Sequence, residues 1–249
     1  MDCGPHIPLR QEHAEYQLIM NNIILIETST ALCSVALSQG DEITACRESS
    51  APKAHASLTA VFVQEVLQER GLKLSDCQAI CVSKGPGSYT GLRVGVSTAK
   101  GLCFGSGHPL VAVGTLDTLV AQAREEASED LTPTYVIPMI DARRMEVYSA
   151  VFTPEGKQLT ETVPVIVDEN SFSEYLQQGV CLFIGDGAGK CADVIKHPNA
   201  RFFQCNPKAS AMISPALEAY KEKRFEDVAY FEPFYLKEFV ATVSKKKLF

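Results

Sequence analysis

The residue types best suited to chemistry gather in a glycine-rich stretch, residues 84–95, with the sequence Lys-Gly-Pro-Gly-Ser-Tyr-Thr-Gly-Leu-Arg-Val-Gly. It follows an apolar run, residues 79–82, that is typical of a short buried strand, and its glycines permit a very tight turn. Ser88 or Thr90 can cap the helix that follows, where free backbone N–H groups and the helix dipole favour an anion. The P-loop pattern is missing because the lysine precedes the glycines. Two interpretations stay open: a packed joint between strand and helix, or a nucleotide-binding loop made of Gly85, Pro86, Gly87 and Ser88.

Carboxylates at strand ends are the second set of candidates. Glu27 and Asp141 each end the first predicted strand of one half of the chain, and Asp186 lies in a second glycine-rich turn at residues 185–189. Acids placed in this way can act as bases in a cleft, but an acid at a strand end is also an ordinary turn residue. A kinase-like, ATP-dependent phosphotransferase that uses Asp141 as its base is therefore an alternative function.

The sequence contains little evidence for a metal site or for a catalytic nucleophile. His55, His108 and His197 have no mutual spacing typical of metal ligands, and no Cys-x-x-Cys pair occurs. The Gly-x-Ser-x-Gly pattern that presents a catalytic serine is also absent. We expect neither a metal site nor a Ser-His-Asp triad.

The composition is that of a globular protein with a substantial core: 249 residues, of which 46% are hydrophobic and 21% charged. A formal net charge of −7 argues against binding of a long nucleic acid by this chain alone, because such binding needs clustered Lys and Arg. The odd number of cysteines, nine, favours a reducing cytoplasm, and no apolar run reaches membrane-spanning length. Residues 1–19 lack the apolar core of a signal peptide and predict a poorly ordered extension.

The predicted elements follow the order β-β-β-α-β-α-β-α, and this order occurs twice. We predict an N-terminal lobe over residues 20–128, a C-terminal lobe over 134–230 and a tail over 231–249. The first lobe is expected to contain strands at 23–26, 33–38, 42–47, 79–82 and 110–113 and helices at 55–70, 89–103 and 115–126. The second is expected to contain strands at 135–140, 145–152, 159–167, 180–184 and 201–204, helices at 171–177 and 211–224, and a helix opened by residues 185–189.

Two helices of the first lobe carry more apolar and small surface than one sheet can cover. The helix at 55–70 has two apolar stripes, and Gly91, Gly95 and Ala99 form a smooth stripe on the next helix that lets another backbone come close. The two helices, a second subunit or both could cover these surfaces. The candidate interface comprises Leu58, Val61, Phe62, Val66, Gly91, Val94, Gly95, Thr98, Ala99 and Leu102.

The duplicated order resembles the α/β fold of the actin, hexokinase and Hsp70 superfamily, which is ribonuclease H-like. Within that superfamily the sequence looks like the TsaB family over about residues 22–234. TsaB proteins are the bacterial partners of TsaD in the synthesis of threonylcarbamoyladenosine at position 37 of tRNA. The resemblance rests on residues 24–30 (Ile-Leu-Ile-Glu-Thr-Ser-Thr), on residues 84–95, and on Asp141-Ala142-Arg143-Arg144 followed by Glu146-Val147-Tyr148.

The resemblance implies an accessory subunit rather than an enzyme. TsaD-like enzymes carry a His-x-x-x-His metal pair where this chain has Thr115 and Leu119. The two helices are expected to bind a TsaD-like catalytic subunit or, in its absence, a second copy of this chain. A TsaE-like ATPase joins the complex, tRNA is bound only indirectly, and no membrane is involved. No cofactor is bound tightly, and ATP or ADP at the complex interface would touch residues 85–88.

Overall fold

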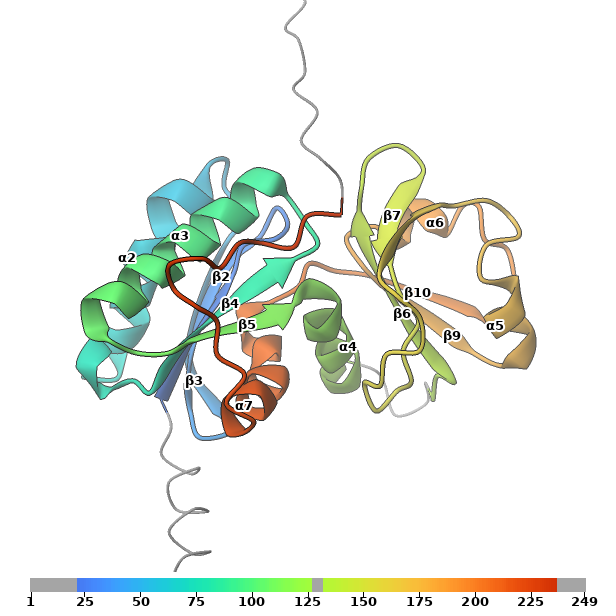
Figure 1. Ribbon diagram of the computed structural model, residues 1–249. Helices are drawn as coiled ribbons and strands as arrows, with labels where there is room; N and C mark the ends of the chain where they lie inside the picture. The colour runs from blue at the N-terminus through green and yellow to red at the C-terminus, as the bar shows by residue number, and fades with distance from the viewer. Residues whose placement is uncertain (1–21, 127–131, 237–249) are drawn as a thin grey trace, which may run out of the picture.

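The computed structural model describes residues 22–126 and 132–236, which form two α/β lobes arranged side by side (Figure 1). The predicted extension at residues 1–19 and the lysine-rich end of the predicted tail lie outside these residues. Each lobe is built on a five-stranded mixed sheet. All the candidate site residues lie in the described part of the chain.

The first lobe contains β1 (Asn22–Glu27), β2 (Cys33–Gln39), β3 (Glu42–Ser49), α2 (Ala54–Glu69), η1 (Leu74–Asp76), β4 (Ala79–Gly85), α3 (Tyr89–Ser106), β5 (Leu110–Gly114) and α4 (Thr115–Glu126). β1 pairs antiparallel with β2 and parallel with β4, so the sheet order is β3-β2-β1-β4-β5. The apolar run of β1 is buried because it is a central strand covered on both faces.

The second lobe contains β6 (Tyr135–Asp141), β7 (Glu146–Ser149), β8 (Val163–Ile166), α5 (Ser173–Gln178), β9 (Cys181–Gly185), α6 (Ala188–Cys191), β10 (Ala200–Gln204), η2 (Ala209–Met212) and α7 (Ile213–Lys221). Its sheet order, β10-β9-β6-β7-β8, has the same topology as the first. Both lobes therefore have the order β-β-β-α-β-α-β-α, and the predicted duplicated fold is confirmed.

Several elements of the second lobe are shorter than the sequence predicted. β8 covers only four residues instead of 159–167, because Leu159 belongs to a separate loop in which its N–H bonds to the carbonyl of Val151. Pro164 is tolerated because β8 is an edge strand. The helix predicted after the second glycine-rich turn, α6, also has only four residues. Among residues 132–236 there is therefore no helix as long as α2 or α3.

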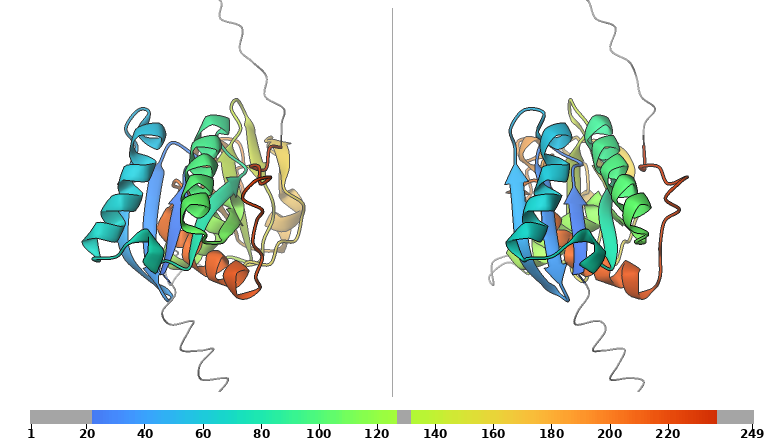
Figure 2. Two further views of the ribbon diagram at one scale, coloured as in Figure 1. Left: turned by 60° about the vertical axis from the view of Figure 1, so that its left-hand side comes forward. Right: turned by 90° about the vertical axis from the view of Figure 1, so that its left-hand side faces the viewer.

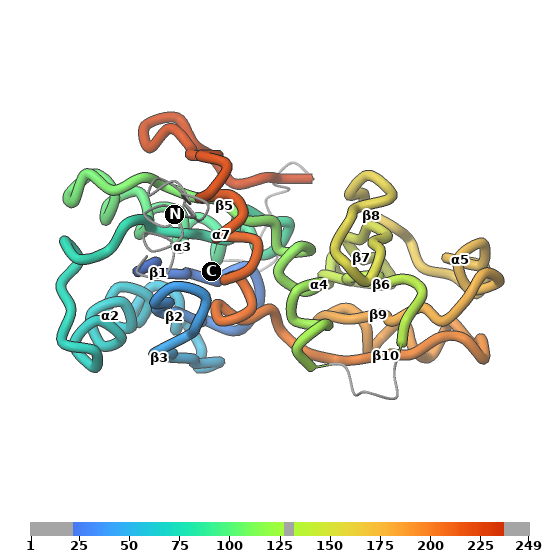
Figure 3. Tube along the Cα trace, turned by 90° about the horizontal axis from the view of Figure 1, so that it is seen from below, coloured from blue at the N-terminus to red at the C-terminus, as the bar shows by residue number. Residues whose placement is uncertain are grey.

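The two lobes exchange their last helices. α2 and α3 lie side by side over one face of the first sheet (Figure 2), whereas α7 of the second half covers the opposite face of that same sheet. In return, α4 of the first half packs on β6 and β9 of the second sheet and lies between the lobes (Figure 3). The predicted boundary at residues 128–134 therefore divides the strands but not the helices.

After α7 the chain returns to the first lobe as an irregular segment, residues 226–236, which we name the C-terminal strap. The strap begins beside β5, where the N–H of Glu226 bonds to the carbonyl of Leu110 at 2.8 Å. It then crosses α3, whose Lys100 donates from Nζ to the carbonyls of Ala229 and Phe231 at 3.0 and 3.1 Å. The predicted division at residue 230 therefore falls inside a segment that packs on the first lobe.

Candidate functional site

The small-residue stripe of α3 faces its own lobe. A side chain at Gly91 would collide with the carbonyl of Thr28, and one at Gly95 would collide with the hydroxyl of the same threonine. Ala99 is fully buried. The stripe does permit the predicted close approach, but the backbone that approaches is the β1–β2 turn and not a partner. These three candidate interface residues therefore face the interior of the chain, and their spacing could not show which side of the helix faces inward.

The outward surface of α2 and α3 consists of other residues, which we name the α2–α3 face. Phe62 and Val66, predicted for the interface, are instead buried in the core beneath α2. Val61, with 41% of its surface exposed, and Phe104, with 88%, are the large apolar side chains of the face. The half-buried members of the face are Leu58, Val94, Thr98 and Leu102.

Phe104 is an exposed side chain of the α2–α3 face that the sequence analysis did not name. It lies next to Cys103, which is buried, and one residue of an α-helix turns by about 100°. Continuing the buried pattern Ala99–Cys103 along α3 would have placed Phe104 on the outside. On the same outer side, Gly101 and Gly105 have open space where a side chain would lie. The exposed smooth stripe of α3 is thus formed by these glycines.

The glycine-rich loop between β4 and α3 is tightly packed within the chain. Gly85 has a left-handed φ of +106° and lies against the carbonyl of Phe234 in the strap, while Pro86 is buried. The N–H of Ser88 donates to the carbonyl of Ser29 at 2.6 Å, and its hydroxyl caps α3 by accepting from the N–H of Gly91 at 3.3 Å. These contacts favour the packed joint. Nucleotide binding stays a prediction that only Gly87 and Ser88 are placed to serve.

An aromatic and cationic contact holds the strap beside this loop. The guanidinium of Arg93 lies over the ring of Tyr89, 4.2 Å from its centre, and its Nε donates to the hydroxyl of Tyr235 at 3.2 Å. The N–H of Phe234 donates to the carbonyl of Lys84 at 2.7 Å. The strap therefore covers the loop that the sequence singled out as a ligand site.

Thr115 and Leu119, which stand where TsaD-like enzymes carry a metal-binding histidine pair, both contact other parts of this chain. The hydroxyl of Thr115 lies 2.9 Å from that of Ser83. Leu119 is fully buried among apolar side chains between α4 and the second sheet. Among residues 22–126 and 132–236, no group of three or more His, Cys, Asp or Glu side chains is arranged to hold a metal ion.

Glu27 is buried at the end of β1, in a polar turn. Its Oε1 accepts from the N–H of Ser29 at 2.7 Å, and its Oε2 has no hydrogen-bond partner among the described residues. Burial raises the pKa of this carboxyl to about 7, against the opposing effect of the hydrogen bond from Ser29. Glu27 is therefore a protonatable group of the core rather than an exposed catalytic base.

Asp141 occupies the same place in the second lobe, in a very different environment. Its Oδ1 forms an ion pair with Lys190 Nζ at 2.6 Å and accepts from the N–H of Arg143 at 2.7 Å. Oδ1 of Asp186 accepts from the N–H of Asp141 at 2.9 Å, and burial raises the pKa of Asp186 to about 6. The charge of Asp141 is thus already balanced by a lysine.

The turn after β6 holds two exposed arginines in an unfavourable backbone conformation. Arg143 has φ of +70° and Arg144 has φ of +51°. In the left-handed region a residue with a Cβ costs roughly 1–2 kcal/mol, and Asn or Gly would normally be found there. Both arginines therefore adopt a backbone conformation that residues with a Cβ rarely adopt.

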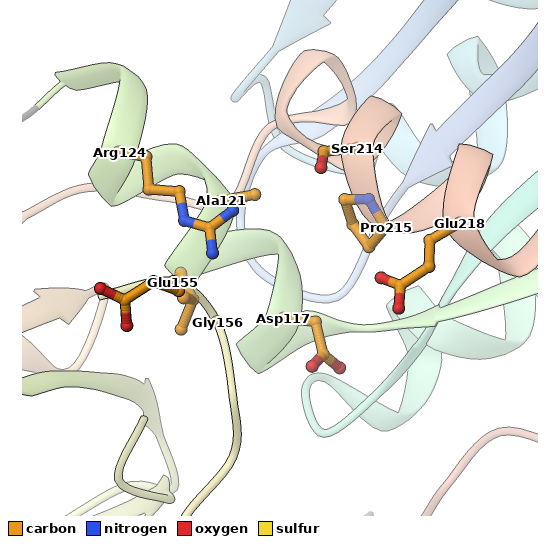
Figure 4. A pocket seen from close by; sticks show the side chains of 9 residues that line it. Asp117, Ala121, Arg124, Glu155, Gly156, Ser214, Pro215 and Glu218 are labelled. Carbon is orange, nitrogen blue, oxygen red and sulfur yellow. The ribbon is translucent and has the colours of Figure 1, made fainter. Parts of the chain in front are cut away.

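A pocket between the lobes brings together residues that the sequence did not connect (Figure 4). It is lined by α4, by the turn at residues 154–156 and by α7, with Asp117, Arg124, Glu155 and Glu218 as its charged side chains. Nε of Arg124 donates to the carbonyl of Pro154 at 2.7 Å, and burial raises the pKa of Asp117. None of the candidate site residues lies in this pocket.

Comparison with known proteins identifies the family. Residues 48–230 match the family model of TsaD, tRNA N6-adenosine threonylcarbamoyltransferase. The tRNA threonylcarbamoyladenosine biosynthesis protein TsaB of Escherichia coli is 30% identical over 226 residues, covering 88% of this chain and 96% of that protein. TsaB of Haemophilus influenzae is 39% identical over 131 residues, covering 52% and 53%.

A solved structure agrees with the sequence relatives. YeaZ from Pseudomonas aeruginosa superposes with a TM-score of 0.77 at 26% identity, covering 87% of this chain and all of that one. A tRNA N6-adenosine threonylcarbamoyltransferase of Paracoccus denitrificans is 47% identical, but only over 66 residues, which are 18% of its length. The match to TsaB of Escherichia coli covers nearly the whole of both proteins, whereas the match to the Paracoccus transferase covers a short part of each. The chain belongs to the TsaB family of the actin and hexokinase-like superfamily.

Proposed function

We propose that this chain is a non-catalytic subunit that binds a TsaD-like enzyme through the α2–α3 face and supports threonylcarbamoyl transfer to adenosine 37 of tRNA. The observation that carries the proposal is the exposure of Phe104 and Val61, 88% and 41%, on two adjacent helices. Large aromatic side chains exposed beside small residues are typical of a protein interface rather than of a solvated helix. Membership of the TsaB family supplies the tRNA modification in which that interface serves.

The residues of the candidate catalytic positions support a role without chemistry of its own. Thr115 and Leu119 are engaged within the chain, and neither can replace a metal-binding imidazole. The carboxylate of Asp141, the base of the kinase-like alternative, is paired with Lys190. A general base in that position would first have to lose its ion pair.

The same face serves two partners in this proposal. In the absence of the TsaD-like subunit, a second copy of the chain covers it, because a twofold axis can place identical helix pairs against each other. A TsaE-like ATPase completes the assembly. ATP or ADP at the complex interface meets only Gly87 and Ser88, since Gly85 and Pro86 are buried.

We place this assembly in the cytoplasm, where tRNA is modified. The eight cysteines among the described residues are all free, and six of them are buried. Free thiols in this number fit a reducing compartment. In the part of the chain that the structure describes, no helix is both long and apolar enough to cross a bilayer.

Light scattering of this chain mixed with the TsaD-like protein of the same cell tests the proposal. We expect a one-to-one complex that is lost when Val61→Asp and Phe104→Asp are combined. Ile166→Asp is the matched control, because Ile166 is 77% exposed on β8 of the other lobe. All three proteins should have the same melting temperature, since each substituted side chain already contacts water.

Two results would contradict the proposal. Failure of the unaltered chain to associate would remove the subunit role, and a complex that survives the double substitution would move the interface away from the α2–α3 face. Steady ATP turnover by the isolated chain, lost in Asp141→Asn, would instead support the kinase-like alternative.

A further inference from the structure

The turn between β6 and β7 carries two exposed arginine side chains that have no bonding partner among the described residues. The guanidinium groups of Arg143 and Arg144 are exposed and form no ion pair or side-chain hydrogen bond with another described residue. Most other described arginines are engaged, for example Arg47 with two glutamates of α2 and Arg224 with Glu222. The pair is therefore not part of the internal ion-pair pattern of the protein.

The chain fixes the backbone of this turn firmly. Lys190 Nζ donates to the carbonyl of Arg144 at 2.8 Å and to that of Glu146 at 2.6 Å, while it also pairs with Asp141. The N–H of Arg143 donates to Oδ1 of Asp141. Because the carboxylate of Asp141 is paired with Lys190, it forms no ion pair with either guanidinium. Hydrogen bonds therefore fix the backbone of this turn, while the guanidinium groups of the two adjacent arginines remain exposed to solvent.

We infer that Arg143 and Arg144 bind phosphate groups of the tRNA while the RNA is held by the catalytic subunit. A guanidinium presents a planar fork of N–H donors that matches phosphate oxygens, and two adjacent forks suit neighbouring phosphodiesters. The net charge of −7 explains why the contact operates only within the complex, since the chain as a whole repels RNA. This inference rests on the proposed function, which brings tRNA to this chain.

The test uses the assembled complex of this chain with the TsaD-like subunit and an unmodified tRNA. Light scattering first establishes that Arg143→Gln combined with Arg144→Gln still forms the complex. The affinity for tRNA is then measured at several salt concentrations. We expect binding to weaken about ten-fold at low salt and the slope of log affinity against log salt to fall by about 1.5, because each phosphate contact contributes roughly 0.7–0.9 to the slope.

Two further variants separate charge from structure. Arg143→Lys with Arg144→Lys keeps both charges and should retain the salt slope, although it loses the forked geometry. Arg70→Gln is the matched control: Arg70 is also exposed and without a side-chain partner among the described residues, but it lies alone at the end of α2, and its removal should leave the slope unchanged.

The outcomes distinguish this inference from the proposed function. If the unaltered chain forms no complex, the proposed function fails. If the double glutamine variant forms the complex and binds tRNA with unchanged affinity and slope, the phosphate contact is refuted. Loss of complex formation in that variant alone would also refute it, since the arginines would then bind acidic groups of the partner protein.

Discussion

The two lobes share one strand order but differ in the helices that cover it. The first lobe carries α2 and α3, of 16 and 18 residues, whereas the corresponding α5 and α6 of the second have 6 and 4. Long helices give the first lobe a continuous outer face with exposed apolar side chains. The second lobe has short helices and a cluster of charged groups around Asp141. The same topology therefore carries an exposed apolar helix face on one lobe and a cluster of charged groups on the other.

The difference is sharpest at the first strand of each lobe. Glu27 and Asp141 both end that strand. Glu27 is completely buried, whereas the side chain of Asp141 is 44% exposed. The glycines of α3 allow this burial because they let the β1–β2 turn pack against the helix. Substitutions at the glycines and at the two acids therefore probe the contrast between the lobes directly.

The largest effect is expected from Gly95→Ala in α3. The new methyl group would collide with the hydroxyl of Thr28, so either the helix or the β1–β2 turn must move. We expect a loss of about 2–4 kcal/mol in the free energy of unfolding, in the range typical of overpacking plus a displaced polar group. Urea denaturation measures it.

Gly101→Ala is the matched control in the same helix. Nothing lies within 4 Å of a side chain at Gly101, and alanine is favoured over glycine in a helix by up to about 1 kcal/mol. A small gain in stability is therefore expected. Equal effects at the two glycines would show that the stripe containing Gly95 does not face the sheet.

An effect within the same range is expected from the buried acid of the first lobe. The pKa of Glu27 is raised from 4.5 to about 7, so the folded protein holds this proton more tightly than the unfolded chain. Stability is then greatest below about pH 4.5 for this group, falls as the pH rises to about 7, and is constant above that value. Between these two pH values the free energy of unfolding falls by roughly 3 kcal/mol because of this group.

Glu27→Gln removes this titration while keeping a carbonyl that can accept from the N–H of Ser29. The difference in unfolding free energy between the variant and the unaltered protein should grow in favour of the variant as the pH rises from about 4.5 to about 7. Urea titrations at a series of pH values check this. A difference that stays constant with pH would mean that Glu27 is ionised in the folded state.

The smallest effect is expected from Asp141→Asn in the second lobe. The ion pair with Lys190 is partly exposed, and exposed pairs contribute about 0.2–1 kcal/mol. Asparagine still accepts from the N–H of Arg143, so the turn should persist. We expect a change in the urea midpoint of unfolding that 0.5 M salt largely removes. A loss comparable with that of Gly95→Ala would indicate that the charged cluster is as structural as the packed turn.

The sequence was sufficient to predict where helices and strands lie along the chain. It was not sufficient to predict which surface of a helix packs against the rest of the protein. Periodicity located α2 within one residue at each end, and Ser88 caps α3 as expected. The same spacing that revealed the stripe at Gly91, Gly95 and Ala99 could not show that it faces Thr28. A stripe of small residues permits approach from either side, and the identity of the approaching backbone is a property of the whole fold.

The exchange of α4 and α7 escaped prediction for a related reason. Both helices are amphipathic, and an apolar stripe shows that a helix covers a sheet without showing which one. The burial of Glu27 was also missed, because a glutamate before Thr-Ser-Thr is typical of a solvated turn. Of the two large apolar side chains exposed on the α2–α3 face, Val61 was named from the sequence and Phe104 was not, because the sequence analysis followed the buried stripe of α3 and not its outer side.

The exchanged helices make each half of the chain a structural component of the other. A fragment ending at Glu126 would keep all five strands of the first sheet but would expose the apolar surface that α7 covers, and the remaining fragment would lack α4 over β6 and β9. Because neither fragment can bury its whole core, we expect the two lobes to unfold as one cooperative unit. When the two fragments are mixed, we expect them to associate and fold together, because each supplies the helix that covers the sheet of the other.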